Sequence, residues 1–206
     1  MVNGRAVDDP RRSSQCWSGG AERMRRAGEL TENEGGLVAL VQRKGALTAY
    51  QIAREYQASP IYTFNTAKGK LYPLIDRLVE RGLLSSDQVI DDRRGTKLYS
   101  CTDVGRDALR TWVSSFREEH ELPPDPLRRK LQALALLGRR EQLAWVQEAR
   151  TRLSQRLQAV ENFDAEAEGR FGRLAQDNAR KSLRGRLQWL DDLEMSIKND
   201  AGLQDK

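Results

Sequence analysis

The pattern of apolar and polar positions predicts helices along the first half of the chain. From Asn33 onward, apolar residues recur at intervals of three and four, which is the period of an amphipathic helix. In the segment LVALVQRK this spacing places Leu37, Leu40 and Val41 on one stripe. Gly45 follows the last residue of the pattern, and glycine commonly ends a helix. The first packed element is therefore expected to be a helix that ends at Gly45.

Two further helices are predicted by the same period. Thr48 can cap the segment TAYQIAREYQ, whose periodic positions are Ala49 or Tyr50, Ile52, Ala53 and Tyr56. Ser59-Pro60 should end this helix, because the residue before a proline disfavours the helical conformation. After IYTFN, Asn65 or Thr66 can cap a third helix with the sequence KGKLYPLIDRLVE.

A change of pattern after Gly82 predicts a hairpin. Residues 88–90 and 97–99 are expected to form two short strands, and DDRRG between them has the composition of a turn. Thr102 can cap a fourth helix, DVGRDALRTWVSSF. The order of three helices, a hairpin and a helix is that of a winged helix-turn-helix. In this fold the third helix reads DNA and the hairpin is the wing.

The third helix has an unusual start. Its apolar face consists of Leu71, Leu74, Ile75 and Leu78. The opposite face near the start consists of Gly69, Tyr72, Pro73 and Asp76, with Lys68 and Lys70 on either side. A small residue permits close approach to a groove, and lysines can contact phosphates or guanine edges. The composition therefore favours an end that enters the major groove, and an ordinary amphipathic helix with an irregular start stays open for this helix alone.

The distribution of charge adds to this prediction. The chain has 35 Lys and Arg against 30 Asp and Glu, a net charge of +5 that permits a polyanionic partner. Between Thr66 and Ser100 there are seven basic against five acidic residues, so the surplus is small. Placement is more informative, because Arg93, Arg94 and Lys97 lie at or beside the predicted turn, where a wing would meet the DNA backbone.

Three segments together resemble the PadR family of bacterial transcriptional regulators. They are LTAYQI at residues 47–52, KLYPLIDRLVERGLL at 70–84 and RRGTKLYSCTDVGRDAL at 93–109. The resemblance covers roughly residues 37–113. It implies a winged-helix DNA-binding domain joined to a C-terminal helical dimerisation region. It also implies a regulator that most often represses and is released by a small molecule or by stress.

The resemblance assigns DNA-binding roles residue by residue. Tyr50 matches the aromatic residue of the family's second helix, and Leu71, Tyr72 and Pro73 match its Leu-Tyr-Pro. Where the family usually has Ser-Pro-Gly-Thr, this chain has Ala67, Lys68, Gly69 and Lys70. Cys101, where the family often has leucine, is expected to be a small buried strand residue, with a redox-sensing thiol as the alternative. The candidate DNA-binding residues are Tyr50, Thr66, Lys68, Gly69, Lys70, Tyr72, Pro73, Arg93, Arg94 and Lys97.

The C-terminal part is predicted to be helical after a proline-rich linker, EEHELPPDP. Gly169 and Gly172 mark a reversal between its last two apolar stripes. DNA readers of this type bind two half-sites as dimers, and long apolar stripes need a partner, so the region is expected to form a homodimer. An intramolecular bundle packed on the DNA-binding domain is the alternative. The expected dimer contacts are Leu183, Leu187, Leu190, Leu193 and Ile197.

Trp145 and Trp189 lie within these helices. They are expected to belong to the core. The family resemblance adds a second possibility, because aromatic residues near the dimer interface can line an effector cavity in relatives.

The predicted fold class is mainly α, with a winged helix-turn-helix, a small β-hairpin wing and a C-terminal α-helical dimerisation domain. The domains are expected at residues 31–117 and 127–206, with the linker at 118–126. Residues 1–30 lack a hydrophobic period and are expected to be a mobile tail. An alternative is that Met24 is the native start.

Composition argues against other classes of protein. No apolar run is long enough to cross a bilayer or resembles a secretory signal, and Cys16 and Cys101 suggest no disulfide framework. We therefore expect a cytoplasmic protein. His120 is the only histidine, and no metal-ligand cluster, activated nucleophile or phosphate loop is recognisable, so neither catalysis nor a cofactor is expected.

The sequence thus predicts a homodimeric regulator of transcription that binds an inverted repeat in double-stranded DNA. An interaction adaptor that uses a winged-helix fold to bind another protein is the alternative.

Overall fold

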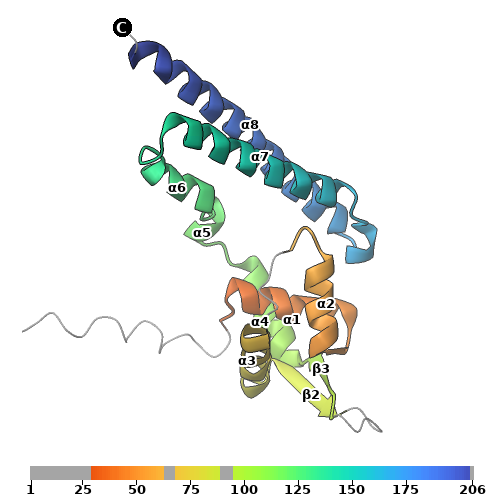
Figure 1. Ribbon diagram of the computed structural model, residues 1–206. Coiled ribbons are helices and arrows are strands. Elements are labelled where there is room, and N and C mark those ends of the chain that lie inside the picture. The colour runs from red at the N-terminus through yellow and green to blue at the C-terminus, as the bar shows by residue number, and fades with distance from the viewer. Residues whose placement is uncertain (1–28, 63–67, 89–94, 205–206) are drawn as a thin grey trace, which may run out of the picture. The chain divides into compact units, whose positions relative to one another are not determined.

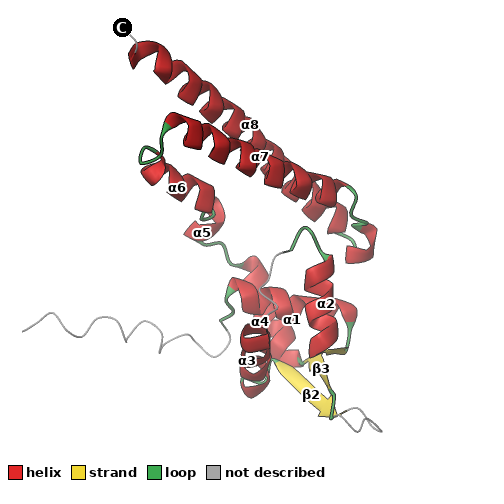
Figure 2. Ribbon diagram, in the orientation of Figure 1, coloured by secondary structure: helices red, strands yellow, loops and turns green. Residues whose placement is uncertain are grey.

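The computed structural model describes residues 29–62, 68–88 and 95–204 (Figure 1). Helices make up most of the described chain, and the strands form one small sheet (Figure 2). This arrangement confirms the predicted fold class in its winged-helix and helical parts. The predicted tail lies outside the described residues up to position 28. Leu30, near the end of that prediction, is already buried.

Contacts divide the chain into two compact units, and each is described by itself below. The first comprises residues up to 46 together with residues 75–115, and the second comprises residues 47–74 together with those from 116 onward. This division does not follow the predicted domain boundaries, which remain a prediction.

Helix α1 (Glu32–Lys44) begins at a cap that the stripe alone did not indicate. The Glu34 amide donates to Thr31 Oγ1 at 3.3 Å, and the Thr31 amide donates to Glu34 Oε2 at 2.9 Å. This reciprocal pair is a capping box, which satisfies two amides that have no helical partner. The helix ends at Gly45 as predicted, and the residue has a φ of 86° that favours glycine. The predicted stripe is buried and consists of Leu37, Leu40 and Val41, with Val38 added.

Helix α4 (Asp103–Ser114) packs against α1 through a close approach. A Cβ atom on Gly35 would overlap the indole ring of Trp112. The Trp112 Nε1–H donates to Glu32 Oε1 at 3.2 Å, so the ring is held at both its apolar face and its polar edge. Gly35 is therefore the residue that lets these two helices meet. Thr102 caps α4 as predicted, since its hydroxyl accepts from the Gly105 amide at 3.0 Å.

Helix α2 (Ala49–Ala58) has the predicted cap and the predicted end. Thr48 and Gln51 form a second capping box, and the helix stops at Ser59 before the proline. Of the two candidates for its first apolar position, Ala49 is buried and Tyr50 is 73% exposed. The Tyr50 ring is therefore available to a partner.

The sheet contains three strands, in the order β1 (Leu47–Thr48), β3 (Lys97–Cys101), β2 (Leu84–Gln88). β2 and β3 are antiparallel, with Leu84 opposite Cys101 and Gln88 opposite Lys97. The hairpin was predicted, but its first strand begins four residues earlier than expected, because residues 84–87 pair with β3 without an alternating pattern of their own. Val89 and Ile90 lie outside the described residues. β1 was not predicted.

The C-terminal helices are α5 (Glu118–Glu121), α6 (Pro126–Leu134), α7 (Arg139–Glu161) and α8 (Gly172–Gln204), with a 3₁₀ turn at Glu166–Glu168. The predicted reversal is confirmed between α7 and α8, where Gly169 has a φ of 85°. Among the described residues, no helix combines the length and apolarity needed to cross a membrane.

The predicted linker contains a helical turn, α5. The Arg117 amide donates to Nδ1 of His120 at 3.1 Å, and the His120 ring meets the Phe116 ring edge-on at 5.4 Å between centroids. Pro126 does not interrupt structure but begins α6, with Asp125 as its cap. Proline is well suited to the first helical position, because its missing amide proton would have no helical partner there.

Candidate nucleic-acid interface

Helix α3 (Lys68–Glu80) has the two faces that its sequence predicts. The predicted buried face is confirmed, because its four residues are at most 5% exposed: Leu71, Leu74, Ile75 and Leu78. The residues on the other side are exposed, and Tyr72 is 42% exposed. These exposed residues are Gly69, Lys70, Tyr72, Pro73 and Asp76. One face therefore belongs to the core, and the start of the helix offers a small residue, a cation, an aromatic ring and a proline to a partner.

Gly69 and Pro73 stand one helical turn apart near this start. Proline has no amide proton, so Pro73 cannot donate to the carbonyl of Gly69. No atom lies within 4 Å of the position that a Cβ on Gly69 would occupy, so neither packing nor backbone conformation requires glycine here. Both residues weaken a helix, and neither is explained by contacts within the described chain.

The other end of α3 is anchored firmly. Arg81 follows the helix and donates from Nη1 to Glu34 Oε1 at 3.1 Å and from Nη2 to the Glu29 carbonyl at 2.7 Å. Glu34 is only 6% exposed. Burial acts to raise the pKa of Glu34, but the hydrogen bonds from Thr31 and the Arg81 guanidinium outweigh it and hold the pKa below its ordinary value. The end of α3 is thus tied to the start of α1.

This anchor is expected to make stability depend on pH in the acid range. Because the pKa of Glu34 is lower in the folded than in the unfolded chain, its contribution is complete above the unfolded value of about 4.3. The contribution is lost as the pH falls through the folded value. Glu34→Gln should lower the free energy of unfolding at neutral pH by about 1 kcal/mol, because a neutral partner bonds Arg81 more weakly. Urea unfolding across the acid range should then show a flatter pH dependence for this variant.

The matched control is Glu80→Gln, which removes the same charge from an exposed position on α3. It should keep the acid dependence of the wild type. Equal pH profiles for Glu34→Gln and the wild type would contradict the role of the anchor.

The wing is described only in part. Lys97 is exposed at the first position of β3, and Gly95 before it has a φ of 64°. Arg93 and Arg94, like Thr66, lie outside the described residues. Lys68 is the first residue of α3. The structure therefore bears on Tyr50, Gly69, Lys70, Tyr72, Pro73 and Lys97 among the candidate DNA-binding residues, all of which are exposed.

Cys101 is a half-buried strand residue. Burial raises the pKa of its thiol, which keeps the group protonated and weakly nucleophilic near neutral pH. This favours the packing role over the redox-sensing alternative.

The predicted dimer stripe divides into two parts. Leu190 and Ile197 are buried in a cluster with Val146 of α7, and Leu193 packs against that cluster. Leu183 and Leu187 are half-buried and lie outside it. Part of the stripe is therefore covered by α7 of the same chain. The dimer contacts themselves stay a prediction.

Trp145 and Trp189 pack against the same cluster. A cleft of about 370 Å³ lies elsewhere, where the chain reverses between α7 and α8, and neither tryptophan lines it. The cleft is lined mostly by charged side chains, several of them paired with one another, such as Arg173 with Glu166 and Arg180 with Asp177. Both tryptophans are thus half-buried against the apolar cluster, and an effector role for them stays a prediction. Within the described ranges, no group of three His, Cys, Asp or Glu side chains could hold a metal ion.

The comparison with protein families agrees with this geometry. Residues 37–111 match the transcriptional regulator PadR-like family. This segment is a PadR-like domain. It contains α2, α3, the wing strands and most of α1 and α4. The matched family consists of transcriptional regulators and not of enzymes, which confirms the expectation drawn from the absence of a catalytic motif.

Solved structures extend the similarity beyond the PadR-like domain. Bacillus subtilis PadR in complex with operator DNA is 18% identical with a TM-score of 0.62, and the match covers 80% of this chain and 98% of that one. A PadR-like regulator from Bacillus cereus is 14% identical with a TM-score of 0.63 and coverages of 82% and 99%. The Vibrio cholerae virulence activator AphA is 17% identical with a TM-score of 0.60 and coverages of 81% and 98%. At these identities the similarity establishes the fold. None of the curated proteins compared with the sequence matches it.

Proposed function

We propose that the protein is a sequence-specific DNA-binding regulator of transcription, which reads the major groove with the start of α3 and contacts the backbone with its wing. The observation that carries the proposal is the composition of α3. Its apolar face is buried in the core, while the exposed start holds two helix-weakening residues that no contact among the described residues explains. Lys70 supplies a cation at this end, and Tyr50 of α2 and Lys97 of β3 are also exposed.

The proposal includes a homodimer on an inverted repeat. A winged helix covers one half-site, and two linked modules bind far more tightly than either alone. Leu183 and Leu187 of α8 are the residues of the predicted stripe that remain for a contact with a second copy, since Leu190 and Ile197 are covered within the chain. Bacillus subtilis PadR, which has the same fold, is found with operator DNA. A regulator acts where the chromosome lies, so the proposal places the protein in the cytoplasm.

Repression relieved by a small molecule is the mode of action that we infer. Bacillus subtilis PadR is also found in complex with p-coumaric acid, which supports an effector for proteins of this fold. Trp145 and Trp189 are half-buried and pack against the cluster around Leu190, so part of each ring stays accessible. We therefore keep them as the proposed effector contacts.

The test is binding of the full chain to the promoter region of its own gene. Fluorescence anisotropy should show tighter binding to this duplex than to a random duplex of equal length, and footprinting should show a protected inverted repeat. Log affinity should fall with log salt concentration at a slope of about −0.9 per phosphate contact. Equal affinity for both duplexes, or binding that does not change with salt, would contradict DNA reading and favour the adaptor.

The wing should contribute affinity without sequence preference. Replacing Arg93 and Arg94 with alanine is expected to make the salt slope shallower by about 1 for each lost phosphate contact. The ratio of operator to random affinity should stay the same. Arg152→Ala is the control, because it removes an exposed arginine from α7 where Glu148 pairs with it. A changed ratio in the wing variant would show that the wing reads bases or groove width.

A further inference from the structure

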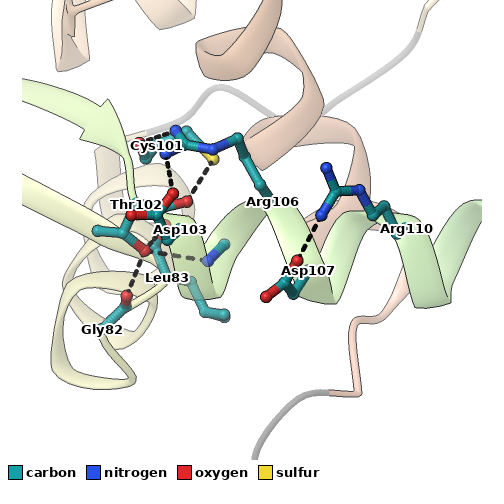
Figure 3. A network of polar contacts seen from close by, with 9 residues as sticks. Gly82, Leu83, Cys101, Thr102, Asp103, Arg106, Asp107 and Arg110 are labelled. Atoms are coloured by element: carbon teal, nitrogen blue, oxygen red, sulfur yellow. Dashed lines mark hydrogen bonds and ion pairs between the residues drawn. The ribbon is translucent and has the colours of Figure 1, made fainter.

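A compact joint connects the end of α3 to the wing and to α4. Figure 3 shows three segments meeting there: the exit of α3 at Gly82 and Leu83, the end of β3 at Cys101 and Thr102, and the first turn of α4. All of these segments belong to the first compact unit. The joint therefore connects the end of α3 with β3 and α4.

The end of α3 leaves two backbone carbonyls, those of Gly82 and Leu83, without a partner in the helix. The Gly82 amide donates to the Val79 carbonyl and the Leu83 amide donates to the Leu78 carbonyl, both at 2.9 Å. Gly82 has a φ of 68°. These two bonds and the left-handed glycine form a Schellman ending, which stops the helix and turns the chain into β2. The carbonyls of Gly82 and Leu83 then need donors from another segment.

Thr102 supplies those donors. Its hydroxyl lies 2.6 Å from the Gly82 carbonyl oxygen and 3.2 Å from that of Leu83, and its amide donates to the Leu83 carbonyl at 3.2 Å. A hydroxyl has one proton, so the shorter contact to Gly82 is the principal donation. The same oxygen accepts from the Gly105 amide at 3.0 Å. One side chain thus caps α4 and holds the end of α3.

Gly105 makes this double role possible. A Cβ atom on Gly105 would overlap the Leu83 carbonyl oxygen and would lie 3.0 Å from Sγ of Cys101. The first turn of α4 therefore packs so closely against the residues after α3 that no side chain fits at position 105. Arg106 adds a bond from Nη1 to the Cys101 carbonyl at 3.1 Å, so β3 and α4 are joined on a second side.

The joint lies at the far end of α3 from the residues that read DNA. The helix rises about 1.5 Å per residue, so Lys68 is about 18 Å from Glu80 along the axis. A tilt of about 10° at the joint would move the reading end by about 3 Å, which exceeds the tolerance of a hydrogen bond to a base edge. Contacts at the joint can therefore decide whether the lysines meet their bases.

We propose that Thr102 is a positioning residue for operator recognition. Its hydroxyl, by donating to the carbonyls that end α3, sets the direction of the reading helix relative to the wing. The inference rests on the proposed function, and it adds to that function a residue that touches no DNA. A residue that served only as a helix cap would affect stability, but it would not change the preference for operator over random DNA.

The experiment compares variants that remove or keep the Thr102 hydroxyl with a variant that weakens a different helix cap. Thr102→Val keeps the branched shape but removes the donor and the cap, and Thr102→Ser keeps both. Thr48→Val is the matched control, because Thr48 caps α2 in a capping box with Gln51. For each purified full-length variant, circular dichroism establishes the temperature range in which it is folded. Anisotropy within that range then gives the ratio of operator to random-duplex affinity.

Thr102→Val is expected to lower this ratio about tenfold, as the loss of one well-placed base contact would. Thr102→Ser and Thr48→Val should keep the wild-type ratio. If Thr102→Val does not fold, Thr102→Asp replaces it, because aspartate caps a helix but cannot donate to Gly82. It should show the same loss of ratio.

Two outcomes overturn the inference. A folded Thr102→Val protein with the wild-type ratio means that the hydroxyl does not position α3. An equal loss in Thr48→Val means that weakened caps in general lower the ratio. A wild type that does not distinguish operator from random DNA is a different result, because it removes the proposed function and the inference with it.

Discussion

Replacing both Lys68 and Lys70 with alanine is expected to abolish most of the preference for operator DNA. Lys70 is exposed in the first turn of α3, and Lys68 begins the helix. A lysine that contacts a base edge contributes about 1–3 kcal/mol of affinity, so each substitution should weaken binding by roughly tenfold to a hundredfold. Anisotropy titrations of the single and double variants against operator and random duplexes would measure the effect.

The control for this experiment is Arg77→Ala on the same helix. Arg77 is exposed and follows Lys70 by seven residues, which returns it to nearly the same side about 10 Å further from the start. Since recognition helices enter the groove by their N-terminal end, Arg77→Ala should cost less than Lys70→Ala. An equal loss for every duplex sequence would assign the lysines to phosphates. Unchanged binding in both lysine variants would remove this helix end from the interface.

The helices up to residue 114 could be predicted because their signals are local. Thr48 and Thr102 cap helices through amides three residues away, and Gly45 ends α1 through its own backbone conformation. Such bonds need only a few neighbouring residues to form, so the sequence around each cap contains the whole interaction. The buried face of α3 was predictable for a similar reason, because a helix of fixed period has only one way to gather its four apolar residues.

The contacts that pack the elements of the first unit together could not be predicted, because the partners are remote in the chain. Arg81 binds Glu34 and the Glu29 carbonyl, 47 and 52 residues away. Trp112 lies against Gly35 from a helix near the other end of the unit. β2 also depends on a remote partner. Its sequence, LSSDQ at residues 84–88, has no strand pattern, and these residues form a strand because they pair with β3. The residues next to Gly35 and Arg81 in the sequence do not indicate which distant side chains contact them.

For the candidate functional residues too, local features could be predicted from the sequence and contacts with remote residues could not. The exposed start of α3 was predictable from its composition, since Gly69 and Pro73 contradict the helical pattern around them. Thr102 was recognisable as a cap but not as a donor to the end of α3, because Gly82 is 20 residues earlier in the chain. The apolar stripe of α8 predicted burial, but a spacing of three and four is the same whether the covering helix belongs to the same chain or to a second copy.

Two variants of α8 can show which of its leucines pack within the chain and which contact a second copy. One is expected to lower stability and the other to weaken the dimer. Leu190 is fully buried in the cluster with Val146 and Ile197, so Leu190→Ala should lower the free energy of unfolding by about 2–5 kcal/mol. Trp145 and Trp189 pack against this cluster, so their fluorescence should report the loss in a urea titration. The variant should nevertheless remain a dimer at concentrations where it is folded.

Leu187→Glu is expected to act on assembly instead. Leu187 is half-buried and lies outside the cluster, so a carboxylate there can reach water in the single chain. In a dimer contact the same charge would be buried without a partner, which is costly. Light scattering over a range of protein concentrations should therefore show a shift towards monomer, with an unfolding transition close to that of the wild type. Operator affinity should fall by orders of magnitude, because each half-site is then bound by an independent module. A Leu187→Glu protein that stays a dimer, or a Leu190→Ala protein that dissociates while folded, would show that the stripe is divided differently between the chain and its second copy.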